Sequence, residues 1–141
     1  INMNSRKKVF VVCHDAGGSE IISSLIKSRP EIDPIFFLDG PAKEIFDRKL
    51  GLVGNVSSIE TGVINSNWLL TGTSWQSDLE YQAIKTAKKY NRYTVSFLDH
   101  WINYKERFMW FGSNGFPDEI YVGDLPAKTL ANKIFNEIKR I

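Results

Sequence analysis

The sequence has 141 residues and a formal net charge of +2, with 43% hydrophobic and 24% charged residues. This size and composition are typical of one globular domain, 1–141, and exclude a disordered or fibrous chain. Lys and Arg are scattered among acidic residues, which argues against nucleic acid as a partner. No apolar stretch approaches the ~20 residues of a transmembrane segment. The single cysteine, Cys13, excludes a disulfide framework and favours a reducing compartment. We therefore expect a cytoplasmic protein, at most peripheral at the inner face of the membrane.

Short apolar runs alternate along the chain with amphipathic segments. The runs are rich in β-branched and aromatic residues and have the length of strands, and the first of them, 8–13 (KVFVVC), predicts a strand buried on both faces. A weaker pattern over 53–63 is compatible with a short strand. The predicted strands are 8–13, 34–39, 67–72, 93–98 and 119–123, and helices are predicted over 17–28, 41–50, 77–89 and 126–141.

The third predicted helix has the clearest start signal. Residues 77–80 (SDLE) have the spacing of a capping box. In that motif Ser77 accepts a hydrogen bond from the amide three residues on, and Glu80 reaches back to the amide of Ser77. The helix ends at the basic pair Lys88-Lys89, which suits the negative end of the helix dipole.

Strands that alternate with helices predict βαβ units, a parallel sheet and right-handed crossovers. We expect an α/β fold, a three-layer Rossmann-like sandwich of about five parallel strands in the order 3-2-1-4-5 with helices on both faces. A Rossmann-like and a flavodoxin-like arrangement fit this pattern equally well.

Polar and glycine-rich segments follow the predicted strands. In such sheets ligands bind beyond the carboxyl ends of the strands, where the strand order reverses, which the predicted order places between the first and fourth strands. The segments that would meet there are 14–19 (HDAGGS), 71–75 (TGTSW), 99–101 (DHW) and 123–124 (GD).

The glycine-rich turn after the first strand is a candidate anion site. Asp15, Gly17, Gly18 and Ser19 lead into a predicted helix, where free amides and the positive end of the dipole favour an anion. The segment matches neither GxGxxG nor a P-loop. A tight turn capped by Ser19 explains it equally well. We keep these four residues as candidate ligand-binding residues.

Both histidines of the chain adjoin an aspartate at a predicted strand end, His14 beside Asp15 and His100 beside Asp99. A His–Asp pair can act as a general base with its orienting carboxylate, whereas a structural histidine is the plainer alternative. Because we expect the two pairs to end neighbouring central strands, we favour one shared site with His100, Asp99 and His14 as candidate catalytic residues. The sequence does not decide which of Asp99 and His100 faces the ligand. We expect no cofactor and no metal site, because one Cys and two His without ligand spacing are a poor ligand set.

Two further segments carry candidate ligand-binding residues. Thr73 and Ser74 can donate hydrogen bonds to a phosphate or sugar, or belong to an ordinary loop. Trp101, Lys105 and Arg107 belong to an aromatic and basic segment that suits stacking on a sugar, a base or a partner surface. A hydrophobic cluster under a long loop is the alternative for that segment.

Taken together, these segments resemble a known family. The Gly-Gly turn after a buried strand, then TGTS, SFLDHWINYKERF and PDEIYVGD, are similar to the N-terminal Rossmann-like half of GT-B glycosyltransferases and the related UDP-N-acetylglucosamine 2-epimerases of bacterial surface-polysaccharide loci. The resemblance spans most of the chain and is one of pattern. It implies that Gly17 and Gly18 lie near the donor phosphates or the acceptor. It also implies that Thr73, Ser74, Asp99 and His100 face the acceptor.

In those enzymes the C-terminal half holds most of the nucleotide. The resemblance therefore implies an acceptor-side domain of a sugar-transferring or nucleotide-sugar enzyme in bacterial surface polysaccharide biosynthesis. Its ligand would be a nucleotide-sugar or a glycan acceptor, and a C-terminal GT-B half or a separate partner chain would complete it. A non-catalytic Rossmann-like module that binds a nucleotide or a partner protein is the alternative.

Overall fold

The computed structural model describes residues 8–74, 77–98 and 117–122, and the predicted helix over 126–141 lies outside these ranges. Every strand predicted from the sequence has a counterpart, and an additional short helix is present. The elements are β1 (Lys8–Cys13), α1 (Ala16–Ser28), β2 (Asp33–Leu38), α2 (Pro41–Leu50), α3 (Ile59–Ile64), β3 (Trp68–Thr71), α4 (Leu79–Lys89), β4 (Tyr93–Leu98) and β5 (Glu119–Val122).

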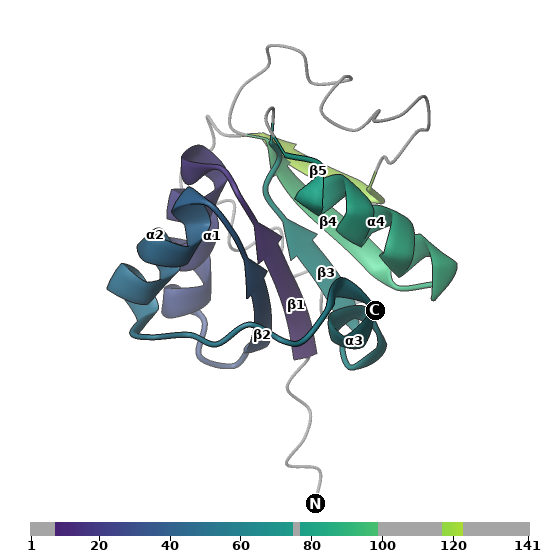
Figure 1. The fold of residues 1–141 in the computed structure, drawn as a ribbon, viewed down its shortest axis with the longest axis horizontal. Helices are drawn as coiled ribbons and strands as arrows, with labels where there is room; N and C mark the ends of the chain where they lie inside the picture. Colours follow the sequence, from purple (N-terminus) through teal and green to yellow (C-terminus); the bar gives the residue numbers. More distant parts are fainter. Residues whose placement is uncertain (1–7, 75–76, 99–116, 123–141) are drawn as a thin grey trace, which may run out of the picture.

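The five strands form one parallel sheet in the order β2-β1-β3-β4-β5 (Figure 1). This confirms the predicted α/β class, and the order is that of the flavodoxin-like arrangement. The predicted order 3-2-1-4-5 is wrong, because β3 pairs with β1, with Val9 opposite Trp68, and not with β2. The strand order therefore reverses between β1 and β3.

The outer edge of β2, where the predicted order places the third strand, is occupied by an irregular segment. Asn55 forms a single parallel bridge with Phe36, and the amide of Val56 donates to the carbonyl of Phe36 at 2.8 Å. The side chain of Asn55 also accepts from the amide of Leu38 and donates to its carbonyl, both at 2.9 Å. These bonds use the edge that a further strand would need, so the chain adds β3 on the other side of β1.

The remainder of the weak 53–63 pattern forms helix α3 rather than a strand. Ser58 is its N-cap, and the hydroxyl of Ser58 accepts from the amide of Thr61 at 3.0 Å. The possible short strand of the sequence pattern is therefore reduced to the single bridge at Asn55.

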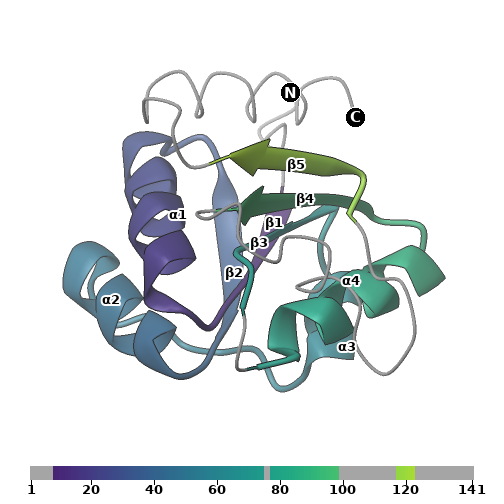
Figure 2. The same cartoon turned by 90° about the horizontal axis from the view of Figure 1, so that it is seen from above.

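The helices lie in two layers, α1 and α2 on one face of the sheet and α3 and α4 on the other (Figure 2). Alternate residues of β1 enter the two cores. Val9, Val11 and Cys13 pack with α1 and α2, whereas Phe10 and Val12 pack with α3 and α4. All five side chains are buried, as the wholly apolar run predicted.

Helix α4 does not begin with the predicted capping box. The hydroxyl of Ser77 accepts from the amide of Leu79 at 3.1 Å, and the N-cap residue Asp78 makes no side-chain cap bond. Glu80 does not reach back to Ser77, because its side chain points into the protein and is only 4% exposed. The capping-box interpretation is therefore wrong. Among the described residues, no helix has the length and apolar character needed to cross a membrane.

Candidate functional site

The reversal of strand order brings the β1–α1 turn next to the β3–α4 loop at the carboxyl edge of the sheet. Gly18, in the first turn of α1, lies directly on Gly72, since a Cβ on Gly18 would be 3.1 Å from the Cα of Gly72. The two segments are thus in contact at the position where ligands bind in sheets of this kind.

Glu80 of α4 bonds to both segments. Its carboxylate accepts from the backbone amide of His14 at 3.0 Å and, through the other oxygen, from the hydroxyl of Ser74. A single buried side chain from the opposite helix layer therefore holds the end of β1 and the loop after β3 together.

The carboxyl of Glu80 titrates near neutral pH. Burial raises the pKa of Glu80 to about 7, because the charged form loses its hydration. The hydrogen bonds from Ser74 and the His14 amide favour the ionised form and limit the rise, while the negative charge of Asp15 adds to it. A buried carboxyl that titrates in this range at the edge of a sheet is typical of functional sites.

The imidazole of His14 is held on two sides. Its Nδ1 lies 2.6 Å from Oδ1 of Asp15, and the two side chains are 20% and 30% exposed. The ring packs against Gly40, whose φ of +57° disfavours other residues, and a Cβ there would lie 2.6 Å from Nε2 of His14. The carbonyl of His14 accepts from the amide of Ala42 at 3.0 Å. A carboxylate on one ring nitrogen is the arrangement that orients a histidine general base.

The glycine-rich segment belongs to helix α1 rather than to a turn before it. Asp15 is the N-cap residue but makes no side-chain cap bond. Ser19 does not cap the helix either, because its hydroxyl donates to the carbonyl of Asp15 at 2.7 Å. Gly18 is buried against Gly72, whereas Gly17 is partly exposed. The contact with Gly72 gives Gly18 a packing role, and contacts of Gly17 and Gly18 with a ligand stay predictions.

Thr73 and Ser74 are each only 2% exposed. The hydroxyl of Ser74 donates to Glu80, so in this structure it is not directed to a ligand. In the sheet itself, the buried hydroxyls of Thr71 and Ser96 lie 2.6 Å apart and join β3 to β4.

Five predicted site residues, Asp99, His100, Trp101, Lys105 and Arg107, lie outside the described residues, and their roles stay predictions. One premise about them is corrected by the strand order. β3 lies between β1 and β4, so His14 and His100 do not follow neighbouring strands. The expectation of a shared site that rested on that adjacency loses this support.

Glu80 is the site residue that the sequence interpretation missed. A signal was present, because Glu80 precedes Ala83, Ile84 and Ala87 by three, four and seven residues and therefore lies on the buried face of α4. An acidic residue on an apolar helix face is rare unless it has partners inside the protein.

Cys13, at the end of β1, is fully buried. Burial, and secondly the negative charge of Glu80, raise the pKa of the Cys13 thiol well above its ordinary range. The thiolate is therefore disfavoured. In the described part of the chain, no group of three or more His, Cys, Asp and Glu is placed to hold a metal ion.

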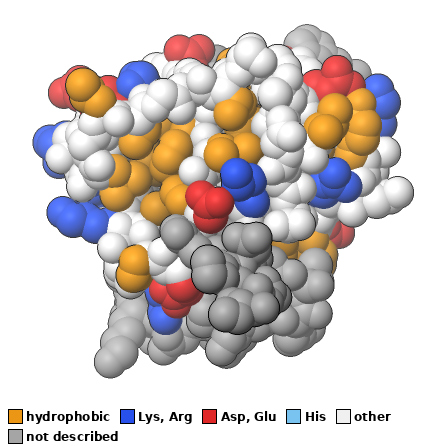
Figure 3. Space-filling model, turned by 90° about the horizontal axis from the view of Figure 1, so that it is seen from below, with side chains coloured by type: hydrophobic (Ala, Val, Ile, Leu, Met, Phe, Trp, Pro, Cys, Tyr) orange, Lys and Arg blue, Asp and Glu red, His pale blue; other side chains and the backbone are white. Residues whose placement is uncertain are grey.

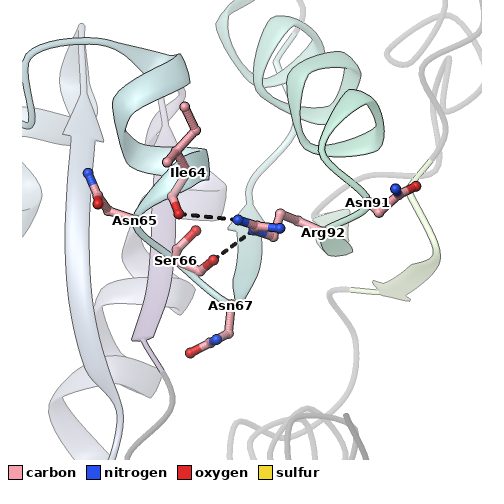
Figure 4. Close-up of a pocket in the computed structure, with 6 residues that line it drawn as sticks. All are labelled: Ile64, Asn65, Ser66, Asn67, Asn91 and Arg92. Atoms are coloured by element: carbon pink, nitrogen blue, oxygen red, sulfur yellow. Dashed lines mark hydrogen bonds between the residues drawn. The ribbon is translucent and has the colours of Figure 1, made fainter.

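The amino edge of the sheet has a hollow of a different kind (Figure 4). It measures about 420 Å³ and is lined by Ile64, Asn65, Ser66, Asn67, Asn91 and Arg92. The guanidinium of Arg92 donates to the carbonyls of Ser66 and Tyr90 at 2.9 Å and of Ile64 at 3.2 Å. This cation is thus engaged with the ends of α3 and α4 rather than directed to a ligand.

The described residues at the amino edge form a surface on which hydrophobic and charged side chains are mixed (Figure 3). Figure 3 looks onto it and shows hydrophobic side chains in separate groups, with Lys, Arg, Asp and Glu side chains between them. The oriented imidazole of His14 and the buried acid Glu80 both lie at the carboxyl edge. We therefore place the candidate site there.

The comparisons with known proteins establish the fold but not a family. No protein-family model and no curated protein matches the chain. Among solved structures, the chain is similar to the BeF3-activated receiver domain of DrrB, with a TM-score of 0.55 and 7% sequence identity, over 95% of this chain and 98% of that one. At this identity the likeness shows the flavodoxin-like fold alone.

Proposed function

We propose that this chain is the acceptor-side domain of a sugar-transferring or nucleotide-sugar enzyme of bacterial surface polysaccharide biosynthesis. The ligand binds at the carboxyl edge of the sheet between β1 and β3. The observation that carries the proposal is the His14–Asp15 pair, a partly exposed imidazole with one ring nitrogen 2.6 Å from a carboxylate. Sugar transfer removes a proton from the attacking hydroxyl, and an oriented imidazole is suited to accept it.

The start of α1 supports a phosphate-bearing or sugar ligand at the same place. The positive end of its dipole lies directly after His14 and Asp15, and the first turn of the helix contains no acidic residue. A C-terminal GT-B half or a separate partner chain would hold most of the nucleotide. The single, buried cysteine supports a reducing compartment, so the proposal includes the cytoplasm or the inner face of the membrane.

A non-catalytic nucleotide-binding or partner-binding module is the second candidate. It is favoured by the contact between Ser74 and Glu80, since the two groups bond to each other inside the protein and neither is directed to a reacting atom. The two candidates differ in whether His14 is needed for turnover or only for binding.

A thermal-shift screen with UDP-, GDP- and CMP-sugars and with glycan acceptors tests the proposal. A ligand that binds only the native state raises the unfolding midpoint of the wild-type protein. We expect at least one sugar nucleotide to do so, and His14→Gln to reduce that rise. Arg48→Gln is the matched control, because Arg48 lies on the surface of α2 and pairs only with Glu20 among the described residues. If no sugar nucleotide or glycan acceptor raises the midpoint, the proposal is wrong.

Turnover separates the two candidates. With a complementing C-terminal half or partner chain, wild-type protein that transfers sugar and His14→Gln protein that binds without transfer support the enzyme. Binding by the wild-type protein without any transfer supports the non-catalytic module.

A further inference from the structure

The carboxyl of Glu80 lies at the start of α1. Its Oε2 accepts from the amide of His14, two residues before the helix. A Cβ on Gly72 would lie 3.4 Å from this oxygen and 3.5 Å from the Cα of Gly18 in the first turn. A charge gained or lost at Glu80 therefore acts directly on the helix end that would receive an anion.

Few charged groups share this position with Glu80. Among the described residues, β1 and its turn contribute the Cys13 thiol, the His14 imidazole and the Asp15 carboxylate. From the β3 side come Gly72 and Ser74, which carry no charge, and the first turn of α1 contains no acidic residue. Asp39 follows β2, and its amide donates to the carbonyl of Cys13 at 3.2 Å. The anionic groups at this edge are thus Asp15, Asp39 and, when ionised, Glu80, and of the two aspartates Asp15 acts on Glu80.

The protonation state of Glu80 decides how well this edge accepts an anion. With Glu80 ionised, the carboxylates of Glu80 and Asp15 both offset the positive end of the helix dipole, which weakens its attraction for an anion. With Glu80 protonated, Asp15 is the carboxylate that remains next to the first turn of α1, and His14 is bonded to it. A bound phosphate would in turn favour the protonated form of Glu80, because like charges at close range disfavour ionisation.

We infer that the binding of a phosphate-bearing ligand at this edge is coupled to the uptake of a proton by Glu80. The inference rests on the proposed function for the class of ligand. The affinity is then highest in mildly acidic solution and falls as the pH rises through the range in which Glu80 ionises. One coupled proton changes the dissociation constant by at most about tenfold per pH unit.

Calorimetric titration between about pH 6 and pH 8.5 tests this coupling. The probes are UDP-N-acetylglucosamine, GDP-mannose and CMP-N-acetylneuraminate, whose phosphates do not titrate in this range. Each titration is repeated in two buffers of different ionisation enthalpy, so that the protons taken up on binding are counted directly. We expect wild-type protein to take up protons and to bind more weakly as the pH rises. We expect Glu80→Gln to take up none and to bind more tightly than wild type at the alkaline end.

A second variant separates Glu80 from His14, since histidine side chains titrate in the same range. His14→Gln should bind more weakly but still take up protons. Proton uptake that disappears in His14→Gln and persists in Glu80→Gln overturns the inference.

A further test is an NMR titration of the wild-type protein, whose result does not depend on whether a variant folds. Carbon NMR of labelled glutamate carboxyls should show the midpoint of Glu80 moving to higher pH when the sugar nucleotide is added. Binding that is independent of pH, or a Glu80 midpoint that does not move, overturns the inference and leaves the proposed function standing. Failure of every sugar nucleotide to bind at any pH overturns the inference, and the proposed function is wrong as well if no glycan acceptor binds either.

Discussion

The two edges of the sheet each contain a charged side chain that joins neighbouring loops through backbone groups. At the amino edge, Arg92 donates to the carbonyls of Ser66 and Tyr90, near the ends of α3 and α4. At the carboxyl edge, Glu80 accepts from the amide of His14 and the hydroxyl of Ser74. Both satisfy polar groups that the ends of helices and strands leave unpaired.

The edges differ in whether that charge is permanent. A guanidinium group, such as that of Arg92, is a permanent cation in proteins. Burial raises the pKa of Glu80 to about 7, so the carboxyl edge changes its charge near neutral pH. A permanent charge stabilises without responding to conditions, whereas a titratable one couples structure to protons. This difference is one reason why we place the candidate site at the carboxyl edge.

The largest expected effect is from Gly18→Val at the carboxyl edge. A Cβ on Gly18 would lie 3.1 Å from the backbone of Gly72, so the larger valine side chain forces α1 away from β3. We expect a loss of about 3 kcal/mol in the free energy of unfolding, measured by urea denaturation. Gly54→Val is the control, because a Cβ there meets nothing within 4 Å. Unchanged stability with loss of ligand would instead assign Gly18 to ligand approach.

The next effect is the pH dependence that Glu80 contributes to stability. Its pKa is raised from 4.5 to about 7 on folding, so between these values the native state binds more protons than the unfolded chain. Stability is therefore full below about pH 4.5 and is lost as the pH rises towards 7. Relative to Glu80→Gln, we expect wild type to lose about 2–3 kcal/mol between about pH 5 and pH 8. Parallel pH curves for the two proteins would show that Glu80 keeps an ordinary pKa.

A somewhat smaller effect is expected from Arg92→Met at the amino edge. The substitution leaves the carbonyls of Ser66 and Tyr90 without their charged donor, and we expect a loss of about 2 kcal/mol in the free energy of unfolding. The loss should be the same at acidic and alkaline pH, unlike that of Glu80. Arg48→Met is the control, since its pair with Glu20 is exposed and screened by solvent, so its loss should leave stability almost unchanged. A loss that varies with pH would remove the contrast between the edges.

The smallest expected effect concerns Cys13, whose thiol is buried beside Gly72 and Glu80. We expect no measurable labelling of the native protein by a thiol reagent over the time in which unfolded protein reacts completely. Glu80→Gln should leave this protection in place, because burial and not charge is its main cause. Rapid labelling of native wild-type protein would show that the carboxyl edge opens to solvent.

Part of the candidate site was predictable and part was not. His14 and Asp15 were expected at the end of the first strand, because a wholly apolar run that stops at polar residues indicates where a buried strand ends. Glu80 was assigned to a capping box, because the spacing SxxE at a helix start is also what capping requires. Whether Glu80 caps the helix or points into the protein depends on the hydrogen-bond donors near it, which here are the His14 amide and the Ser74 hydroxyl. Only the folded chain brings those donors to α4.

By itself the sequence determined the strands, most of the helices and the parallel α/β class. These depend on side-chain periodicity within short segments, as in the run from Val9 to Cys13, where every residue is buried. Only the tertiary structure decided the strand order and the partners of Glu80. The strand order depends on which sheet edge is free. Asn55, 17 residues after Leu38 in the sequence, bonds to Leu38 and occupies the outer edge of β2. The partners of Glu80 depend on contact between β1 and β3, which are far apart in sequence and adjacent in the sheet. Such long-range contacts leave no periodic signal in the segments that make them.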